Sequence, residues 1–285
     1  MAGLHIRLPG MLSPPEPPSA PADHAEFRRV AGRPGAELYR ARLVQHAFEP
    51  HAHQAYGLGV IEAGVERFRY RGTDHLAAPQ SIVAMHPDVL HTGRAETAGG
   101  WRYRMLYLDP ALIDALTGEA HWWFGEVVEA RHPALARHLV SLHRQMWHSD
   151  DSLQVDGLLL DFLAGLRPLA RTGPGGPRDG AAARLGPVID CMRALLHERL
   201  ALADLAAVAE LSPFHFQRKF KAQYHVTPHQ MLMALRLARA KELLAQGVRA
   251  AEVAVATGLT DQAHLTRAFA IRYGVSPGRY QRQVR

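Results

Sequence analysis

Two short stretches in the last third of the chain carry polar and aromatic side chains at helical spacing. In the first, intervals of three and four residues put four side chains on one helical face: Phe214, Gln217, Arg218 and Lys221. The second stretch offers a comparable set: Gln262, Ala263, Thr266 and Arg267. Amide and guanidinium groups can hydrogen-bond to base edges, and cationic groups can meet phosphates. Both faces are therefore candidates for contacts with nucleic acid.

Histidines form the other group of side chains that could do chemistry. His51 and His53 are two residues apart, so on a strand they point to the same face, and His91 follows on a later segment. Three imidazoles can coordinate a metal ion or line a pocket for an organic molecule. The second reading is favoured here, with Tyr56 added to the pocket and no metal assigned. A metal site and a purely structural role remain as alternatives.

The elements that must position the first group form an internal repeat. Leu205 to Pro228 and Val253 to Pro277 match with an offset of 48, which becomes 49 from His215/His264 onward. The matched aromatic and apolar positions are Phe216/Leu265, Phe220/Phe269 and Tyr224/Tyr273. Each copy has small residues in a first helix, then a turn, then a second helix, which is typical of a helix-turn-helix unit.

A long helix is predicted between the two copies. Thr227-Pro228 is a helix start, and the helical pattern runs to about Ala245, with Gly247 as the terminating glycine. About eighteen residues at 1.5 Å each give roughly 27 Å. A rigid connector of that length suits two recognition helices that enter successive major grooves, about 34 Å apart.

These residues resemble the AraC/XylS family of bacterial transcription regulators. The similarity covers about Leu185 to Tyr280 and is carried by SPFHFQRKF, GLTDQAHLTRAF and GVSPGRY, the last ending at Tyr280. It implies double-stranded DNA as partner and, in the order of the motifs, these DNA-facing residues: Phe214, Gln217, Arg218, Gln262, Ala263, Thr266 and Arg267. Family members often have glycine where this chain has His225, which predicts a looser turn or a histidine with positive φ.

The distribution of charge agrees with this assignment. Residues 181–285 hold 15 Lys and Arg against 7 Asp and Glu, whereas residues 1–180 hold 18 against 20. The excess of positive charge therefore belongs to the part that would contact phosphates.

The N-terminal half changes from helical to alternating patterns. Glu66 to Arg71 and Trp101 to Leu108 alternate apolar and polar residues, and Ser81 to Met85 is a further strand. Short strands separated by glycine and proline indicate a β-sandwich or small barrel. The segments PHAHQAYGLGVIEAG and APQSIVAMHPDVLH resemble the cupin barrel that precedes this DNA-binding domain in many family members.

Three helices are predicted after the barrel, over Leu112 to Leu116, Pro133 to Trp147 and Leu153 to Leu166. The last two can form an antiparallel pair. In the family such helices support dimerisation, but amphipathic patterns alone do not separate a dimer contact from packing within the chain.

The resemblance to cupins also raises an enzyme alternative. His51, His53 and His91 occupy the positions of metal ligands in cupin enzymes, which place a glutamate a few residues after the second histidine. Here Gln-Ala-Tyr-Gly follows His53, and the first acid is Glu62. A metal-dependent dioxygenase or isomerase is therefore the alternative function, and we assign no catalytic residue and no cofactor.

The chain is divided into five segments. They are a disordered proline-rich tail (1–24), a cupin-like sensor domain (25–115), a helical dimerisation or support segment (116–170), a linker (171–181) and a DNA-binding domain (182–285). The single cysteine, Cys191, excludes a disulfide framework, and there is neither a signal sequence nor an apolar run of eighteen residues. These features indicate a cytoplasmic protein without a membrane segment.

The expected fold class is α+β with two domains: an N-terminal cupin-like β-barrel with flanking helices, and a C-terminal all-α domain with two helix-turn-helix units joined by a long helix. The expected function is sequence-specific regulation of transcription, controlled by a small-molecule effector in the cupin domain. Expected partners are operator DNA, the effector and a second copy of the chain, and RNA polymerase is a further partner that this function allows.

Overall fold

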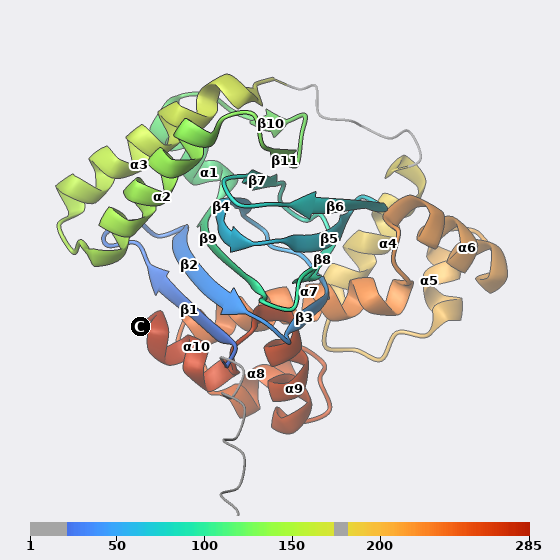
Figure 1. Cartoon of the computed structure of the whole chain (residues 1–285). Coiled ribbons are helices and arrows are strands. Elements are labelled where there is room, and N and C mark those ends of the chain that lie inside the picture. Colours follow the sequence, from blue (N-terminus) through green and yellow to red (C-terminus); the bar gives the residue numbers. More distant parts are fainter. Residues whose placement is uncertain (1–21, 174–181) are drawn as a thin grey trace, which may run out of the picture.

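Figure 1 shows the computed structural model, in which β-structure lies between two groups of helices. The structure describes residues 22–173 and 182–285. Nearly all of the predicted proline-rich tail and most of the predicted linker lie outside the described residues. No helix in the described part of the chain is long and apolar enough to cross a membrane.

Two antiparallel sheets form the N-terminal half. The six-stranded sheet has the order β1 (His24–Arg29), β2 (Ala36–Leu43), β9 (Trp101–Leu108), β4 (Tyr56–Gly64), β7 (Ile82–Met85) and β11 (Val128–Glu129). The four-stranded sheet has the order β3 (Ala47–His51), β8 (His91–Ala95), β5 (Glu66–Tyr70) and β6 (Thr73–Ala77). A short pair, β10 (Trp123–Phe124) and β12 (Ala170–Arg171), lies apart from both.

The alternating sequence of β9 explains how these sheets pack. Trp101, Tyr103 and Met105 belong to one buried cluster, whereas Leu106 and Leu108 belong to another on the opposite face. Successive side chains of a strand point to opposite faces, so one strand contributes to two cores. The strands predicted over Glu66 to Arg71, Ser81 to Met85 and Trp101 to Leu108 are confirmed.

Three helices cover the outer face of the six-stranded sheet. They are α1 (Pro110–Thr117), α2 (Pro133–His148) and α3 (Ser152–Leu166), followed by a short 3-10 turn, η1 (Arg167–Leu169). The Asp151 carboxylate accepts hydrogen bonds from the backbone N–H of Leu153 and Gln154, which fixes the start of α3. Their apolar side chains pack against the sheet in the second buried cluster, so most of their amphipathic pattern serves packing within the chain.

Seven helices form the C-terminal half. They are α4 (Ala182–Ala194), α5 (Leu202–Val208), α6 (Pro213–Tyr224), α7 (Pro228–Ala245), α8 (Ala250–Ala256), α9 (Gln262–Tyr273) and α10 (Pro277–Gln283). The predicted connecting helix is confirmed as α7. Its start is fixed by a capping box in which Thr227 and Gln230 bond each other's backbone N–H.

The turn after α6 contains His225, at a position where family members often have glycine. His225 adopts a positive φ of 59°, and Gly274 has a φ of 73° at the equivalent end of α9. In both copies the helix therefore ends in the left-handed conformation, once with histidine and once with glycine.

The two helix-turn-helix units differ in how their cores are closed. The buried residues of α4 to α6 form a separate cluster around Phe216 and Phe220, together with Met231 and Leu232 from the start of α7. The buried residues of α8 to α10, including Phe269 and Tyr273, belong to the same continuous cluster as the buried side chains between the two sheets. Figure 1 shows α8, α9 and α10 beneath β1 and β3, and α4, α5 and α6 to the right of the sheets.

Candidate functional site

The candidate DNA-facing side of the first unit is carried by α6. Ser212 precedes the helix, and its hydroxyl accepts a hydrogen bond from the N–H of His215. Phe216 and Phe220 are fully buried, which turns the opposite side of the helix to solvent. On that side the Phe214 ring is 71% exposed, in a protein whose other phenylalanines are buried. The remaining predicted side chains are exposed beside it: Gln217, Arg218 and Lys221.

The second unit repeats this arrangement on α9. The carboxylate of Asp261 accepts from the N–H of His264, and Leu265 and Phe269 are fully buried. Gln262, Ala263 and Arg267 are exposed. Thr266 is half-buried, and its hydroxyl donates to the carbonyl of Gln262 at 2.8 Å.

No ion pair within the described residues engages Arg218, Lys221 or Arg267. Three other arginines of this half do form such pairs: Arg239 with Glu242, Arg249 with Glu252 and Arg272 with Glu49. The cationic groups on both exposed faces are therefore available for phosphate or base contacts.

The three predicted histidines meet at the end of β3. One ring nitrogen of His51, His53 and His91 lies within 4.8 Å of those of the other two. His51 and His91 face each other across the β3–β8 pairing, with ring centroids 4.3 Å apart. His53 lies just beyond the end of β3, and its ring is 4.4 Å from that of Tyr107. The three histidines that the sequence analysis grouped together therefore do lie close to one another.

Backbone carbonyls fix the tautomer of two of these rings. His51 Nδ1 donates to the carbonyl of Glu49 at 2.9 Å, and His91 Nδ1 donates to that of Val89 at 3.0 Å. A carbonyl only accepts, so Nδ1 carries the proton and Nε2 keeps its lone pair. Burial lowers the pKa of His91 to about 4, and burial also lowers the pKa values of His51 and His53. All three rings are neutral at neutral pH.

Tyr56 lies apart from the three histidines. Its hydroxyl donates to the carbonyl of Trp122 at 2.6 Å, and its ring belongs to the second core, on the opposite face of β4. The structure therefore does not bring Tyr56 to the pocket in which the sequence analysis placed it.

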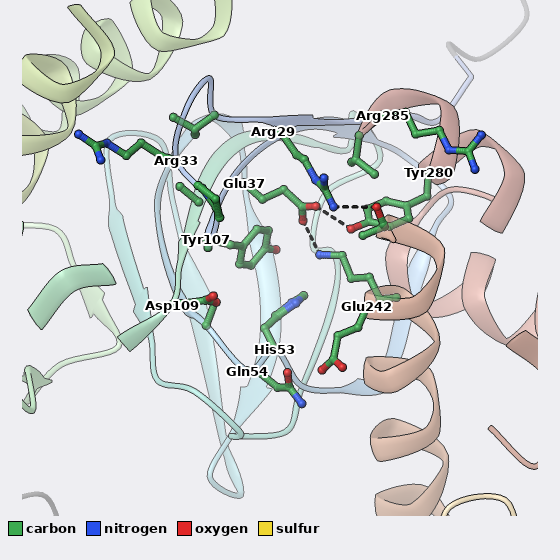
Figure 2. Close-up of a pocket in the computed structure, with 18 of the residues that line it drawn as sticks. Arg29, Arg33, Glu37, His53, Gln54, Tyr107, Asp109, Glu242, Tyr280 and Arg285 are labelled. Atoms are coloured by element: carbon green, nitrogen blue, oxygen red, sulfur yellow. Dashed lines mark hydrogen bonds and ion pairs between the residues drawn. The ribbon is translucent and has the colours of Figure 1, made fainter. Parts of the chain in front are cut away.

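A cavity of about 770 Å³ lies between the barrel and the C-terminal helices. Figure 2 shows its walls, which include His53, Tyr107 and Glu37 from the barrel side and Tyr280 from α10. The cavity also takes Lys241 and Glu242 from α7 and Tyr273 from α9. Both halves of the chain therefore contribute to one cavity, and His53 connects it to the histidine cluster.

Lys241 is a charged group of this cavity that contacts both halves of the chain. Its ammonium pairs with the carboxylate of Glu37 on β2, which also accepts a hydrogen bond from the hydroxyl of Tyr280 at 2.8 Å. Four aromatic rings surround the ammonium within 4.7 to 5.6 Å: Phe27, Tyr107, Tyr273 and Tyr280. The cation is thus held by one carboxylate and by ring faces from both halves.

Comparison with known protein families accounts for both halves of this arrangement. The AraC-like ligand binding domain matches residues 33–163, and a helix-turn-helix domain matches residues 205–283. The chain belongs to the AraC family of transcription regulators. It is a DNA-binding regulator with a ligand-binding domain, as the sequence analysis predicted.

Relatives of this AraC-type regulator include proteins of several bacteria. An uncharacterised helix-turn-helix regulator of Bacillus subtilis, YbfI, is 26% identical over 80% of this chain and 85% of its own length. The MmsAB operon regulatory protein of Pseudomonas aeruginosa is 39% identical, over 33% of this chain and 31% of its own length. An apo form of ToxT from Vibrio cholerae matches 90% of this chain and all of its own with a TM-score of 0.55 at 11% identity, which shows the same two-domain fold.

The residues that lie where the two halves of this regulator meet were not predicted from the sequence. Lys241, Glu37 and Tyr280 are more than 200 positions apart at the extremes, and no local pattern joins them. One signal was present, because Lys241 is one of three lysines in a chain with 30 arginines and lies among the apolar positions of α7. An arginine fork would have extended farther than the compact ammonium that fits between four rings.

Proposed function

We propose that the effector of this regulator occupies the cavity between the barrel and α7, α9 and α10, where it controls how the DNA-binding helices are held. The observation that carries the proposal is that the cavity walls come from both halves of the chain. A molecule bound there touches the sensor and the second helix-turn-helix unit at once. Its differential affinity for two arrangements of these parts then shifts their populations.

The chemistry of the cavity favours an organic carboxylic acid with an apolar body. The carboxylate of such a ligand can replace Glu37 as the partner of Lys241, while the aromatic rings receive the apolar part. This exchange removes an ion pair that joins β2 to α7. ToxT, which has the same fold, has been solved bound to (E)-4-(8-methylnaphthalen-1-yl)but-3-enoic acid, a carboxylic acid with an apolar ring system.

A panel of aromatic and aliphatic carboxylic acids tests this assignment, with the matching primary amides as controls. We expect some acids, and not their amides, to raise the melting temperature of the full-length protein. At a free ligand concentration of about 100 times Kd, the free energy of unfolding rises by about 2.7 kcal/mol. Lys241→Gln should remove the gain, and Arg33→Gln, at the rim of the same cavity, should keep most of it. Equal shifts by acids and amides, or an unchanged response of Lys241→Gln, would refute the carboxylate assignment.

On the DNA side, we propose that α6 and α9 enter successive major grooves of one operator. The side chains that face the bases and phosphates are Phe214, Gln217, Arg218, Lys221, Gln262, Ala263, Thr266 and Arg267. All of these side chains except Thr266 are exposed, and the three cationic groups form no ion pair within the described residues, which supports this assignment. Because the DNA that it binds is genomic, we place the protein in the cytoplasm, with RNA polymerase as a partner at the promoter.

We propose that two copies of the chain associate through α3. The exposed side of this helix carries apolar or small residues at intervals of four, three and four: Leu153, Gly157, Leu160 and Ala164. Leu153 is 81% exposed and Leu160 is 44% exposed. This spacing is that of the seam between paired helices, and an identical helix from a second copy complements it. Leu160→Glu should convert a dimer to a monomer in sedimentation experiments.

We infer a receptor rather than an enzyme. The loop after His53 supplies no carboxylate, and the ring of Tyr273 from α9 lies 6.1 Å from the ring of His53. The cluster thus faces the DNA-binding half. Oxygen uptake with candidate substrates that depends on added iron would overturn this inference.

A further inference from the structure

The histidine cluster has a property that the effector proposal does not use. His51 and His91 each donate a hydrogen bond from Nδ1 to a backbone carbonyl, and no described residue hydrogen-bonds to Nε2 of either ring. His53 brings a third ring nitrogen into the same space. Three neutral imidazoles with converging lone pairs form a set of donors rather than a set of mutually satisfied partners.

We propose that His51, His53 and His91 bind one divalent transition metal ion, with zinc as the reference ion. Imidazole nitrogen is a preferred ligand of zinc, copper, nickel and iron, and three histidines with one open position form an established type of zinc site. The sequence alone did not predict a metal here, because no fourth protein ligand follows His53. The site as built needs none, because the fourth position can take solvent or a donor atom of an effector.

Geometry supports the assignment. Ligand nitrogens at 2.0–2.1 Å from a tetrahedral zinc ion are about 3.4 Å apart. The three nitrogens lie within 4.8 Å of one another, so the rings close by no more than about 1.5 Å to reach that geometry.

The carbonyls of Glu49 and Val89 act as outer-shell partners. A metal-bound histidine usually donates its other N–H to a carbonyl or carboxylate, which holds the ring and raises its basicity. Each carbonyl comes from the residue two positions before its histidine: Glu49 lies on β3, and Val89 lies just before β8, the strand that pairs with β3. The strand pairing therefore orients the two rings before any metal arrives.

The position of the site gives the metal a consequence for DNA binding. The Tyr273 ring lies 6.0 Å from that of His51. Arg272, the preceding residue of α9, pairs with Glu49 at 2.8 Å and donates to the carbonyl of Pro50 at 3.2 Å. A bound ion would fix the end of β3, which is the segment that α9 contacts. This inference goes beyond the effector proposal because it requires no organic ligand.

The test uses the full-length protein, stripped with a chelator and titrated with Zn²⁺ and Co²⁺ in the absence of organic acids. We expect one tightly bound ion per chain, measured in competition with a chelating indicator, and the intense visible absorption of four-coordinate Co²⁺. His53→Gln should weaken binding by more than about 100-fold, since losing even an outer-shell partner costs about 10–100-fold. His138→Ala, an exposed histidine on α2, is the matched control and should bind as the wild type does.

Other histidines among the 18 of the chain can bind ions weakly, so stoichiometry alone does not decide the matter. The decisive comparison is the affinity of wild type, His53→Gln and the triple variant His51→Ala/His53→Ala/His91→Ala. Circular dichroism reports whether each variant is folded. If stripped wild type binds no ion more tightly than the triple variant, or if folded His53→Gln keeps the wild-type affinity, the metal site is refuted. The effector proposal survives that outcome, because it rests on Lys241 and Glu37.

Discussion

The two helix-turn-helix units have the same sequence pattern but different surroundings. The first unit closes its core around Phe216 and Phe220 with its own helices and the start of α7. The second unit completes its core with Phe27, Tyr39 and Phe48 of the barrel. One repeat is thus nearly self-contained, and the other is built into the sensor.

This difference indicates where a signal enters the DNA-binding half. The effector cavity and the histidine cluster both contact α7 or α9, and neither is lined by α5 or α6. The first unit meets the sensor mainly through loops, with Leu90 packed against its core and Asp88 paired with Arg193. A ligand should therefore first change the contacts between the sensor and the second unit, while the first unit keeps its own fold.

The largest expected effect comes from opening each core in turn. Phe216→Ala and Phe269→Ala each remove a fully buried ring and should each cost about 3–5 kcal/mol of local stability. All four tryptophans lie in the N-terminal half, so their fluorescence reports the sensor. In urea unfolding followed by tryptophan fluorescence, Phe269→Ala should lower the midpoint strongly and Phe216→Ala should change it little. Equal shifts would show that both units unfold with the sensor.

The shared core should also respond to pH through Glu66. Burial raises the pKa of this carboxyl from 4.5 to about 8, so the folded state holds the proton more tightly than the unfolded state. Its contribution to stability is full below pH 4.5 and falls as pH rises toward 8, by roughly 1.4 kcal/mol per pH unit at most. Glu66→Gln should remove this fall. The same tryptophan transition, measured for both proteins across this range, checks it, and parallel curves would contradict the assignment.

Readout of DNA should differ between the units as well. Arg218→Ala should relax base preference at one position, with a loss of about 1–3 kcal/mol for the preferred site, whereas Lys221→Ala should weaken all sequences alike. The second unit presents Ala263 and Ala270 on α9, so its half of the operator should be less sharply defined. Selection from random DNA should return one strict and one degenerate box about a helical turn apart. Two equally strict boxes would contradict this division.

Local physics explains what the sequence could predict. The helix boundaries of α7 follow from a cap at Thr227 and a glycine with positive φ at 247, and the faces of β5 and β9 follow from alternation. The histidine cluster was predictable because two of its members are neighbours in sequence. Tyr56 was misplaced relative to them because the loop between β3 and β4, residues 52–55, interrupts the strand alternation, so proximity in sequence no longer fixed the face.

The cavity could not be predicted in the same way. Glu37, Lys241 and Tyr280 come from β2, α7 and α10, and only the docking of the second unit onto the barrel brings them together. That docking depends on side chains of both halves, and in the sequence each of them looks like an ordinary core residue. Pattern analysis recovers the elements and their buried sides, but it does not say which buried side meets which.

The smallest expected effect concerns the ion pair that joins the first unit to the sensor. Asp88 and Arg193 are 3.2 Å apart, with side chains 52% and 46% exposed, so water and salt screen their attraction. Asp88→Asn should therefore cost about 0–1 kcal/mol, and less at high salt. A double-mutant cycle with Arg193→Met, read by hydrogen exchange of α6 amides, measures the coupling. A coupling above about 2 kcal/mol would mean that this contact is far stronger than exposed pairs usually are. The first unit would then be held to the sensor as firmly as the second, and the contrast between the two units would be lost.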